Sequence, residues 1–216
     1  LQSVKLIKSS SFDEIQKVIQ LALTLGTDNN FGHDYFVDFE KRFELKSRNP
    51  VSMGWPRMDE LCKGGLGSSE LGVVIAPTGA GKSMVLAHLG ARALEQGKTV
   101  IHYTLELADT VVGGRYDSCI TGIPLNDLFH SKDMIYEKIQ NVAGHLIIKE
   151  YPTKSATSST LRNHIEKLRK RGINPDMIIV DYADLLRPVK STSEKRHELE
   201  TIYEDLRGMA QEYKCP

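Results

Sequence analysis

The sequence predicts an α/β fold in which a mostly parallel β-sheet is covered by helices on both faces. Two observations support this prediction. From residue 71 onward, short apolar segments alternate with longer segments whose apolar residues recur at helical spacing. A glycine-rich loop at residues 76–83 also joins the first apolar segment to the helix after it. Strands that alternate with helices form parallel sheets, and short strands without a polar face are typical of strands buried on both sides.

The α/β part of the chain is justified element by element. The apolar segments predict strands at residues 71–77, 98–106, 145–152 and 176–182. Periodic apolar faces predict helices at residues 82–96, 158–171 and 197–213, and another begins within residues 105–110. Gly97 and Gly172 follow two of these helices, where glycine commonly ends a helix. A further strand is expected after the last helix, where the sequence ends.

The N-terminal part is predicted to be a separate helical segment. Ser11 and Glu14 have the spacing of a capping box, and Gly26 follows the apolar face of a helix over residues 11–25. Three aromatic residues then repeat at helical spacing, and they either pack on their own domain or dock on a neighbouring subunit: Phe36, Phe39 and Phe43. We therefore divide the chain into a helical segment, residues 1–50, and an α/β domain, residues 51–216.

Composition excludes several classes of protein. Hydrophobic residues make up 40% of the 216 residues, which argues against disorder. The 28 Lys and Arg residues balance 28 Asp and Glu residues, so any nucleic-acid contact must come from a local patch. No apolar run is long enough to span a membrane, and the first ten residues lack the apolar core of a signal peptide. Three cysteines without metal-ligand spacing indicate reduced thiols in a cytoplasmic protein.

The glycine-rich loop has the pattern of a phosphate-binding loop. Its residues are Ala76, Pro77, Thr78, Gly79, Ala80, Gly81, Lys82 and Ser83. Gly79 and Gly81 permit backbone angles that turn N–H groups toward phosphate oxygens, and the following helix adds the positive end of its dipole. Lys82 supplies a point charge for the β- and γ-phosphates, and the Ser83 hydroxyl offers a ligand to Mg²⁺. The loop therefore predicts ATP and Mg²⁺ as the ligands.

Two carboxylates complete the predicted site. Asp181 ends a buried strand, and open α/β sheets bind their ligands at this edge. We expect it to orient Mg²⁺, together with Ser83. Glu106 ends another predicted strand, where it could polarise the attacking water as the catalytic base. Asp184 is the rival for that role, and a helix cap is the alternative role of Glu106.

With these residues in place, the chain resembles the ATPase domain of replicative hexameric DNA helicases of the DnaB type. The resemblance covers roughly residues 50–216 and is closest to the versions from T-even bacteriophages. It depends on "GWPRMDELCKGGLGSSELGVVIAPTGAGKS", on "VIHYTLELAD" with Arg115 downstream, and on "MIIVDYADLLRP". The family often has glutamine three residues after the aspartate, where this chain has Asp184.

The resemblance implies a RecA-like core, preceded by a linker segment that docks on an adjacent subunit. It implies a ring of subunits, normally a hexamer, with single-stranded DNA in the channel and with primase and a helicase loader as partners. Lys82 and Glu106 would be the catalytic residues, and Ser83 and Asp181 the metal-binding residues. The location would be the cytoplasm, or the host cytoplasm for a viral protein. Two alternatives stay open: a RecA-type recombination or repair ATPase, and a KaiC-like regulatory ATPase without nucleic-acid activity.

Two further expectations concern DNA and turnover. The polar segment at residues 187–196 is predicted to be a loop that presents basic residues to phosphates: Lys190, Lys195 and Arg196. A sensor glutamine, the main DNA loops and an arginine finger would all lie beyond Pro216 in this family. We therefore expect the 216-residue chain to bind ATP and Mg²⁺ but to hydrolyse ATP slowly.

Overall fold

The computed structural model describes residues 32–43, 48–189 and 194–216. The chain divides into two compact units, residues 1–47 and 48–216. The helix expected at residues 11–25 lies outside the described residues. Within the described part of the first unit, the aromatic repeat forms only a 3-10 turn, η1 (Glu40–Arg42). Among the described residues its aromatic side chains are exposed: Phe36, Phe39 and Phe43.

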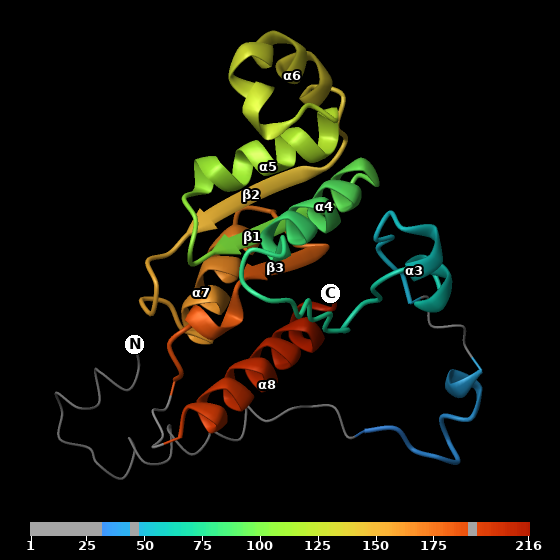
Figure 1. Cartoon of the computed structure of the whole chain (residues 1–216). Coiled ribbons are helices and arrows are strands. Elements are labelled where there is room, and N and C mark those ends of the chain that lie inside the picture. Colours follow the sequence, from blue (N-terminus) through green and yellow to red (C-terminus); the bar gives the residue numbers. More distant parts are fainter. Residues whose placement is uncertain (1–31, 44–47, 190–193) are drawn as a thin grey trace, which may run out of the picture. The chain divides into compact units, whose positions relative to one another are not determined.

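The second unit contains a three-stranded parallel sheet (Figure 1). Its strands are β1 (Thr99–Thr104), β2 (His145–Glu150) and β3 (Met177–Asp181), and their spatial order is β2-β1-β3. In this register Thr104 pairs with Glu150 on one side and with Asp181 on the other. Because all three strands are parallel, their carboxyl ends meet at a single edge of the sheet. The predicted parallel sheet is confirmed.

Helices cover both faces of this sheet. The helices of this unit are α3 (Pro56–Leu61), α4 (Lys82–Glu95), α5 (Asp109–Thr121), α6 (Lys132–Ile139), α7 (Ser158–Arg169) and α8 (Lys195–Tyr213), with 3-10 turns η2 (Leu125–Ser131) and η3 (Ala183–Leu185). One apolar cluster joins α4 and α5 to the sheet, and a second joins α7 and α8 to the opposite face. Among the described residues, no helix is both long and apolar enough to cross a lipid bilayer.

The side chains of β1 point alternately to the two faces of the sheet, and this explains why helices cover both faces. Ile101 and Tyr103 pack in the cluster with α7 and α8, whereas Val100 packs in the cluster with α4 and α5. Successive side chains of a strand point to opposite faces, so an apolar strand needs helices on both sides. The α4 side is tightly packed. A Cβ atom at Gly90 of α4 would lie 2.0 Å from the Tyr116 hydroxyl oxygen of α5, and only glycine permits this approach.

The strand predicted at residues 71–77 is wrong. These residues have no regular secondary structure, and the side chains of Val73 and Ile75 are 49% and 89% exposed. A cavity of about 500 Å³ has residues 71–74 and β3 in its lining, along with apolar side chains of α4 and α8. A strand requires a partner for its backbone groups. The apolar run at residues 71–77 has none, because β3 is paired with β1 alone.

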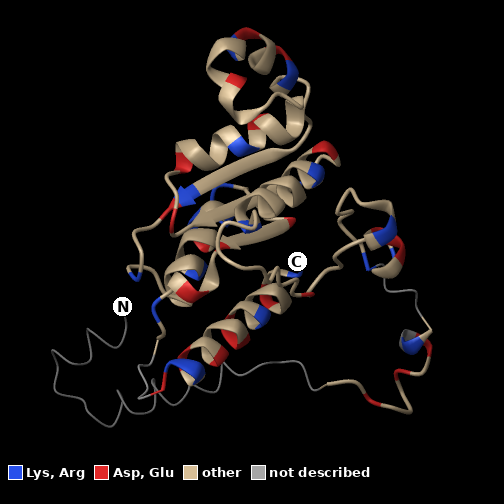
Figure 2. Cartoon of the chain, in the orientation of Figure 1, with Lys and Arg blue, Asp and Glu red and all other residues tan. Residues whose placement is uncertain are grey.

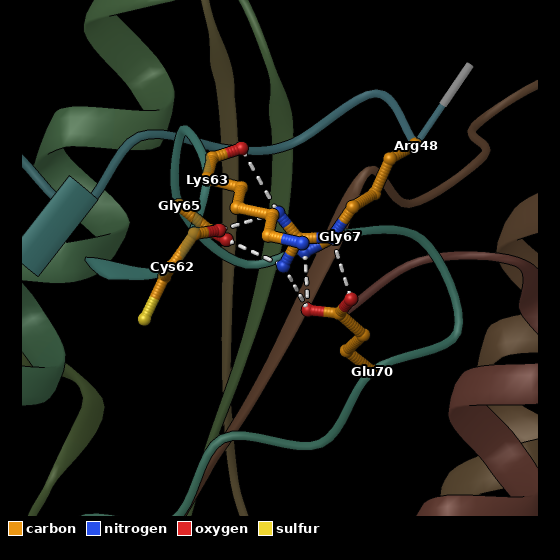
Figure 3. A network of polar contacts seen from close by, with 6 residues as sticks. All are labelled: Arg48, Cys62, Lys63, Gly65, Gly67 and Glu70. Carbon is orange, nitrogen blue, oxygen red and sulfur yellow. Dashed lines mark hydrogen bonds and ion pairs between the residues drawn. The ribbon is translucent and has the colours of Figure 1, made fainter. Parts of the chain in front are cut away.

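Arg48 fixes the chain that precedes this segment (Figure 3). Its guanidinium donates to both carboxylate oxygens of Glu70, at 2.6 and 2.5 Å, and to the carbonyl oxygens of Cys62, Lys63 and Gly65. Hydrogen bonding by Arg48 holds the pKa of Glu70 below its usual range. A planar guanidinium can satisfy a bidentate carboxylate and several carbonyls at once. Arg48 therefore closes residues 62–70 into a compact turn ahead of the phosphate loop.

Candidate functional site

The phosphate loop leads directly into α4, as predicted. The helix begins at Lys82, and its N-cap residue is Gly81, with φ of 93°. Gly79 has φ of 78°, so both glycines adopt a left-handed backbone that other residues rarely take. The Lys82 ammonium donates to the carbonyl oxygens of Ala76, at 2.9 Å, and Pro77, at 3.2 Å. These bonds close the loop and hold the cation beside it.

Asp181 lies at the carboxyl edge of the sheet. Its side chain is buried, with the residue only 1% exposed, and neither carboxylate oxygen has a hydrogen-bond partner among the described residues. Asp181 and Lys82 line the same cavity, so the structure brings these two predicted residues together. A buried carboxylate without a partner is costly unless a cation neutralises it. Mg²⁺ takes oxygen ligands, so the donor set of Asp181 and the half-buried Ser83 fits this ion.

Glu106 lies in the turn after β1 rather than on the strand itself. β1 ends at Thr104, two residues before the position that the sequence suggested. The backbone amide of Leu105 donates to the backbone oxygen of Asp181, at 2.9 Å. The residue just before Glu106 is therefore hydrogen-bonded to Asp181, the other candidate carboxylate residue. The Glu106 side chain is exposed to solvent at this edge.

Asp184, the rival for the catalytic base, is engaged elsewhere. It lies in η3 and accepts a hydrogen bond from the Tyr203 hydroxyl of α8, at 2.9 Å. Burial, and then the bond and charge of Asp184, raise the pKa of Tyr203 to about 12, so the phenol stays protonated and keeps donating. The structure therefore favours Glu106 over Asp184 as the free carboxylate.

Sequence reasoning missed a third carboxylate at the same edge. Glu150 ends β2, and its carboxylate accepts the backbone N–H of Asp109 at 3.2 Å, so it caps the first turn of α5. Charged residues are few along the strands and lie mostly at strand ends and on helices (Figure 2). The sequence held a signal, because Glu150 lies within the strand predicted at residues 145–152. Only the parallel register shows that it flanks Thr104.

The structure corrects the position of the basic residues predicted to meet DNA. Lys195 and Arg196 form the first turn of α8 and are exposed, whereas the sequence placed them in a loop. The loop prediction failed because α8 begins at Lys195, two residues before its predicted start and ahead of the first apolar residue of its face. Lys190 lies outside the described residues. Neither basic residue lines the cavity that Lys82 and Asp181 share.

The parallel sheet, the glycine-rich loop and the buried aspartate define a P-loop nucleotide-binding domain. Residues 50–216 match the family model of the DnaB-like helicase C terminal domain. The chain belongs to this family, and the resemblance seen in the sequence is confirmed. No group of three potential metal-binding side chains of the His, Cys, Asp and Glu type occurs within the described ranges.

Two relatives illustrate the sequence similarity. The chain is 29% identical to the DnaB-like replicative helicase of Enterobacteria phage T4, over 92% of this chain and 45% of that protein. It is 22% identical to the replicative DNA helicase DnaB of Helicobacter pylori (strain ATCC 700392 / 26695), over 95% of this chain and 41% of that protein. The chain thus spans less than half the length of these relatives.

Solved structures confirm the fold class. A DnaB-like replicative helicase, described together with its interactions with primase, superimposes with a TM-score of 0.69 at 15% identity, over 98% of this chain and 53% of that chain. A second solved structure, described as an ATPase domain, superimposes with a TM-score of 0.65 at 16% identity, over 83% of this chain and 66% of that chain. The chain therefore has the RecA-like ATPase fold of DnaB-type helicases.

Proposed function

We propose that this chain is the motor domain of an ATP-dependent DNA helicase that acts in replication. The observation that supports this most directly is the shared cavity. Lys82 of the phosphate loop and the buried, unpartnered Asp181 line it together, in a chain of the DnaB-like family. Family membership favours a helicase over the recombinase and the KaiC-like alternatives.

Each residue of the site has a proposed role. The backbone of residues 76–83 binds the phosphates, and Lys82 exchanges its bonds with Ala76 and Pro77 for phosphate oxygens. Ser83 and Asp181 would hold Mg²⁺, which supplies charge neutralisation at the phosphates when it is bound. Glu106, exposed at the strand edge, orients the attacking water and accepts its proton.

The proposal extends to partners. We propose single-stranded DNA as the track, with Lys195 and Arg196 among its phosphate contacts, and a ring of subunits, normally six. One similar solved structure is described with primase, and we propose primase and a helicase loader as partners of this chain as well. The site of action is the cytoplasm, or the host cytoplasm for a phage protein, where the replicating DNA is.

Nucleotide binding tests the proposed role of residues 76–83 as the phosphate site. The Lys82→Ala variant should bind a fluorescent ATP analogue at least tenfold more weakly in the presence of Mg²⁺, because the phosphates lose their point charge. Lys98→Ala is a suitable control, since it removes a lysine beyond the far end of α4 and should leave the affinity unchanged. Equal affinity of Lys82→Ala and the parent chain would show that residues 76–83 are not the phosphate site.

ATP hydrolysis tests the proposed role of Glu106 as the catalytic base. Glu106→Gln should still bind the analogue but should lose about a hundredfold or more in turnover, since glutamine keeps the shape and removes the base. Asp184→Asn should stay much closer to the parent rate, because Asp184 bonds with Tyr203. The reverse pattern would assign the base to Asp184.

Duplex unwinding, measured on a forked substrate, separates a helicase from a recombinase or a DNA-independent ATPase.

A further inference from the structure

The turn that carries Glu106 is closed by a single buried hydroxyl group. The Thr104 hydroxyl donates to the Leu107 carbonyl oxygen, at 2.7 Å, and accepts from the Leu107 backbone amide, at 3.1 Å. Thr104 is fully buried, so water does not compete for these bonds. Threonine hydroxyls that bond backbone groups nearby in sequence are known to fix local turns. Here both polar backbone groups of Leu107 are held by the same oxygen atom.

The turn is also held on its other side, before Glu106. The Thr104 carbonyl oxygen accepts from the Tyr151 amide, at 2.9 Å, and the Leu105 amide donates to the Asp181 backbone oxygen, at 2.9 Å. The Leu105 carbonyl oxygen accepts from the Thr153 hydroxyl, at 2.9 Å. Residues 104 and 105 are therefore anchored to neighbouring segments of the sheet edge, whereas the far side of the turn depends on Thr104.

Glu106 itself lies between these two anchors. Its side chain is exposed, and no hydrogen bond or ion pair of its carboxylate is seen within the described part of the chain. Its direction must then come from the backbone of the turn. A displacement of about 1 Å in a catalytic group can cost on the order of a hundredfold in rate. The rigidity of residues 104–107 is thus a condition for placing this carboxylate.

We propose that Thr104 is a positioning residue, whose hydroxyl fixes the backbone of Leu107 and so aims Glu106 at the water that attacks ATP. The inference rests on the proposed function, because it takes Glu106 as the base. It adds a residue that does not line the cavity shared by Lys82 and Asp181 and that acts through Glu106. Thr104 also lies in register between Glu150 and Asp181, so its turn is central to the acidic edge of the sheet.

Thr104→Val removes the hydroxyl and keeps the branched shape. Turnover is measured with protein in excess over ATP, with Mg²⁺ and single-stranded DNA present, so that slow hydrolysis remains measurable. Thr104→Val should slow hydrolysis tenfold or more, while the affinity for an ATP analogue stays within twofold. Thr104→Ser, which keeps the hydroxyl, should restore the rate to within about threefold of the parent.

The chain offers a matched control in Thr121, at the end of α5. Its buried hydroxyl likewise donates to one backbone carbonyl, that of Asp117 at 2.6 Å, and accepts from one amide, that of Ile123 at 3.2 Å. Thr121→Val should lower the melting temperature as Thr104→Val does, with an unchanged rate of hydrolysis. If Thr104→Val does not fold, Thr104→Cys keeps a side chain of similar size and takes its place in the same assays.

A double-mutant comparison separates positioning from general damage. If Thr104 acts through Glu106, then Thr104→Val should slow the Glu106→Gln protein by less than twofold. An equal fold-loss in both backgrounds would overturn the proposal, and so would Thr104→Val turnover within twofold of the parent while Glu106→Gln is slow. Parent-like turnover of Glu106→Gln instead removes the base assigned under the proposed function, and the inference with it.

Discussion

At the scale of single residues, His102 is a buried titratable group whose charge state affects stability. It lies on β1 and is fully buried, with its Nδ1 atom 3.0 Å from the Tyr116 hydroxyl oxygen of α5. Its Nε2 atom has no hydrogen-bond partner among the described residues. Burial, and then the positive charge of Arg115, lower the pKa of His102 to about 4. The native state therefore holds this imidazole neutral.

This lowered pKa predicts that stability depends on pH. In the unfolded chain His102 has its ordinary pKa of about 6.5, so between pH 6.5 and 4 the unfolded state binds a proton that the folded state does not. Above pH 6.5 His102 is neutral in both states and does not lower the free energy of unfolding. As pH falls from 6.5 toward 4, protonation of His102 in the unfolded chain lowers that free energy. Between pH 7 and pH 4, the parent should lose about 3 kcal/mol more of its unfolding free energy than His102→Gln.

Urea denaturation at several pH values measures this difference. His145 provides the control, because it lies on the neighbouring strand β2 and is exposed. His145→Gln should retain the parent's pH dependence. Parallel stability curves for the parent and His102→Gln would mean that His102 is protonated, or accessible to water, in the folded protein.

At the scale of elements, β3 pairs with another strand on one side only within the part of the chain that the structure describes. In a parallel strand, alternate residues direct their backbone groups to opposite neighbours. The Leu105 amide bonds the Asp181 oxygen, so Ile179 and Asp181 face β1. The Ile178 amide instead donates to the Pro216 carbonyl oxygen, at 2.9 Å, so Ile178 and Val180 face the cavity.

Hydrogen exchange should reveal this asymmetry. We expect the Val180 amide to exchange at least tenfold faster than the Ile179 amide, because Ile179 bonds within the sheet and Val180 faces the cavity. NMR detection resolves the two amides, and the Ile178 amide should be intermediate. Equal protection of Val180 and Ile179 would mean that the strand predicted at residues 71–77 forms in solution and pairs with β3.

At the scale of the whole molecule, charge gives no general attraction to DNA. Positive and negative side chains each number 28, so binding to single-stranded DNA must depend on local contacts. Lys195 and Arg196 lie in the first turn of α8, where the helix dipole disfavours cations but adds to an anion-binding potential. We propose them as the local contact, although Glu194 and Glu198 lie in the same turn.

Salt dependence tests this contact. Each phosphate neutralised on a single strand contributes a slope of about −0.7 to the plot of log affinity against log salt. Replacing Lys195 and Arg196 together with alanine should make that slope shallower by about 1.4 and should weaken binding equally for all sequences. Fluorescence anisotropy with a labelled oligonucleotide measures both effects.

Lys170 and Arg171 form a matched pair at the other end of a helix, just after α7, and are exposed. Replacing them with alanine should leave the affinity for single-stranded DNA and its salt slope unchanged. Equal weakening by the two double variants would assign DNA binding to general surface charge rather than to the start of α8.

The sequence by itself determined the features that depend on local chemistry. The glycines and lysine of residues 76–83 predicted the loop before α4, because left-handed backbone angles and a helix N-terminus are local properties. Apolar periodicity predicted the strands β1, β2 and β3 and the helices α4, α7 and α8, with ends shifted by a few residues. The apolar run before Asp181 predicted that this carboxylate ends a strand, and Asp181 is the last residue of β3.

Only the tertiary structure decided the features that depend on contacts distant in sequence. Residues 71–77 read as a strand, yet pairing needs a neighbour, and β3 bonds β1 instead. Asp184 stayed a rival to Glu106 as the base until Tyr203 of α8 was seen to bond Asp184. The sequence placed Glu150 within a strand, but only the register across three parallel strands brings it beside Thr104 and Asp181. Local pattern sets which elements form, whereas packing and hydrogen bonding between elements decide which side chains remain free to act.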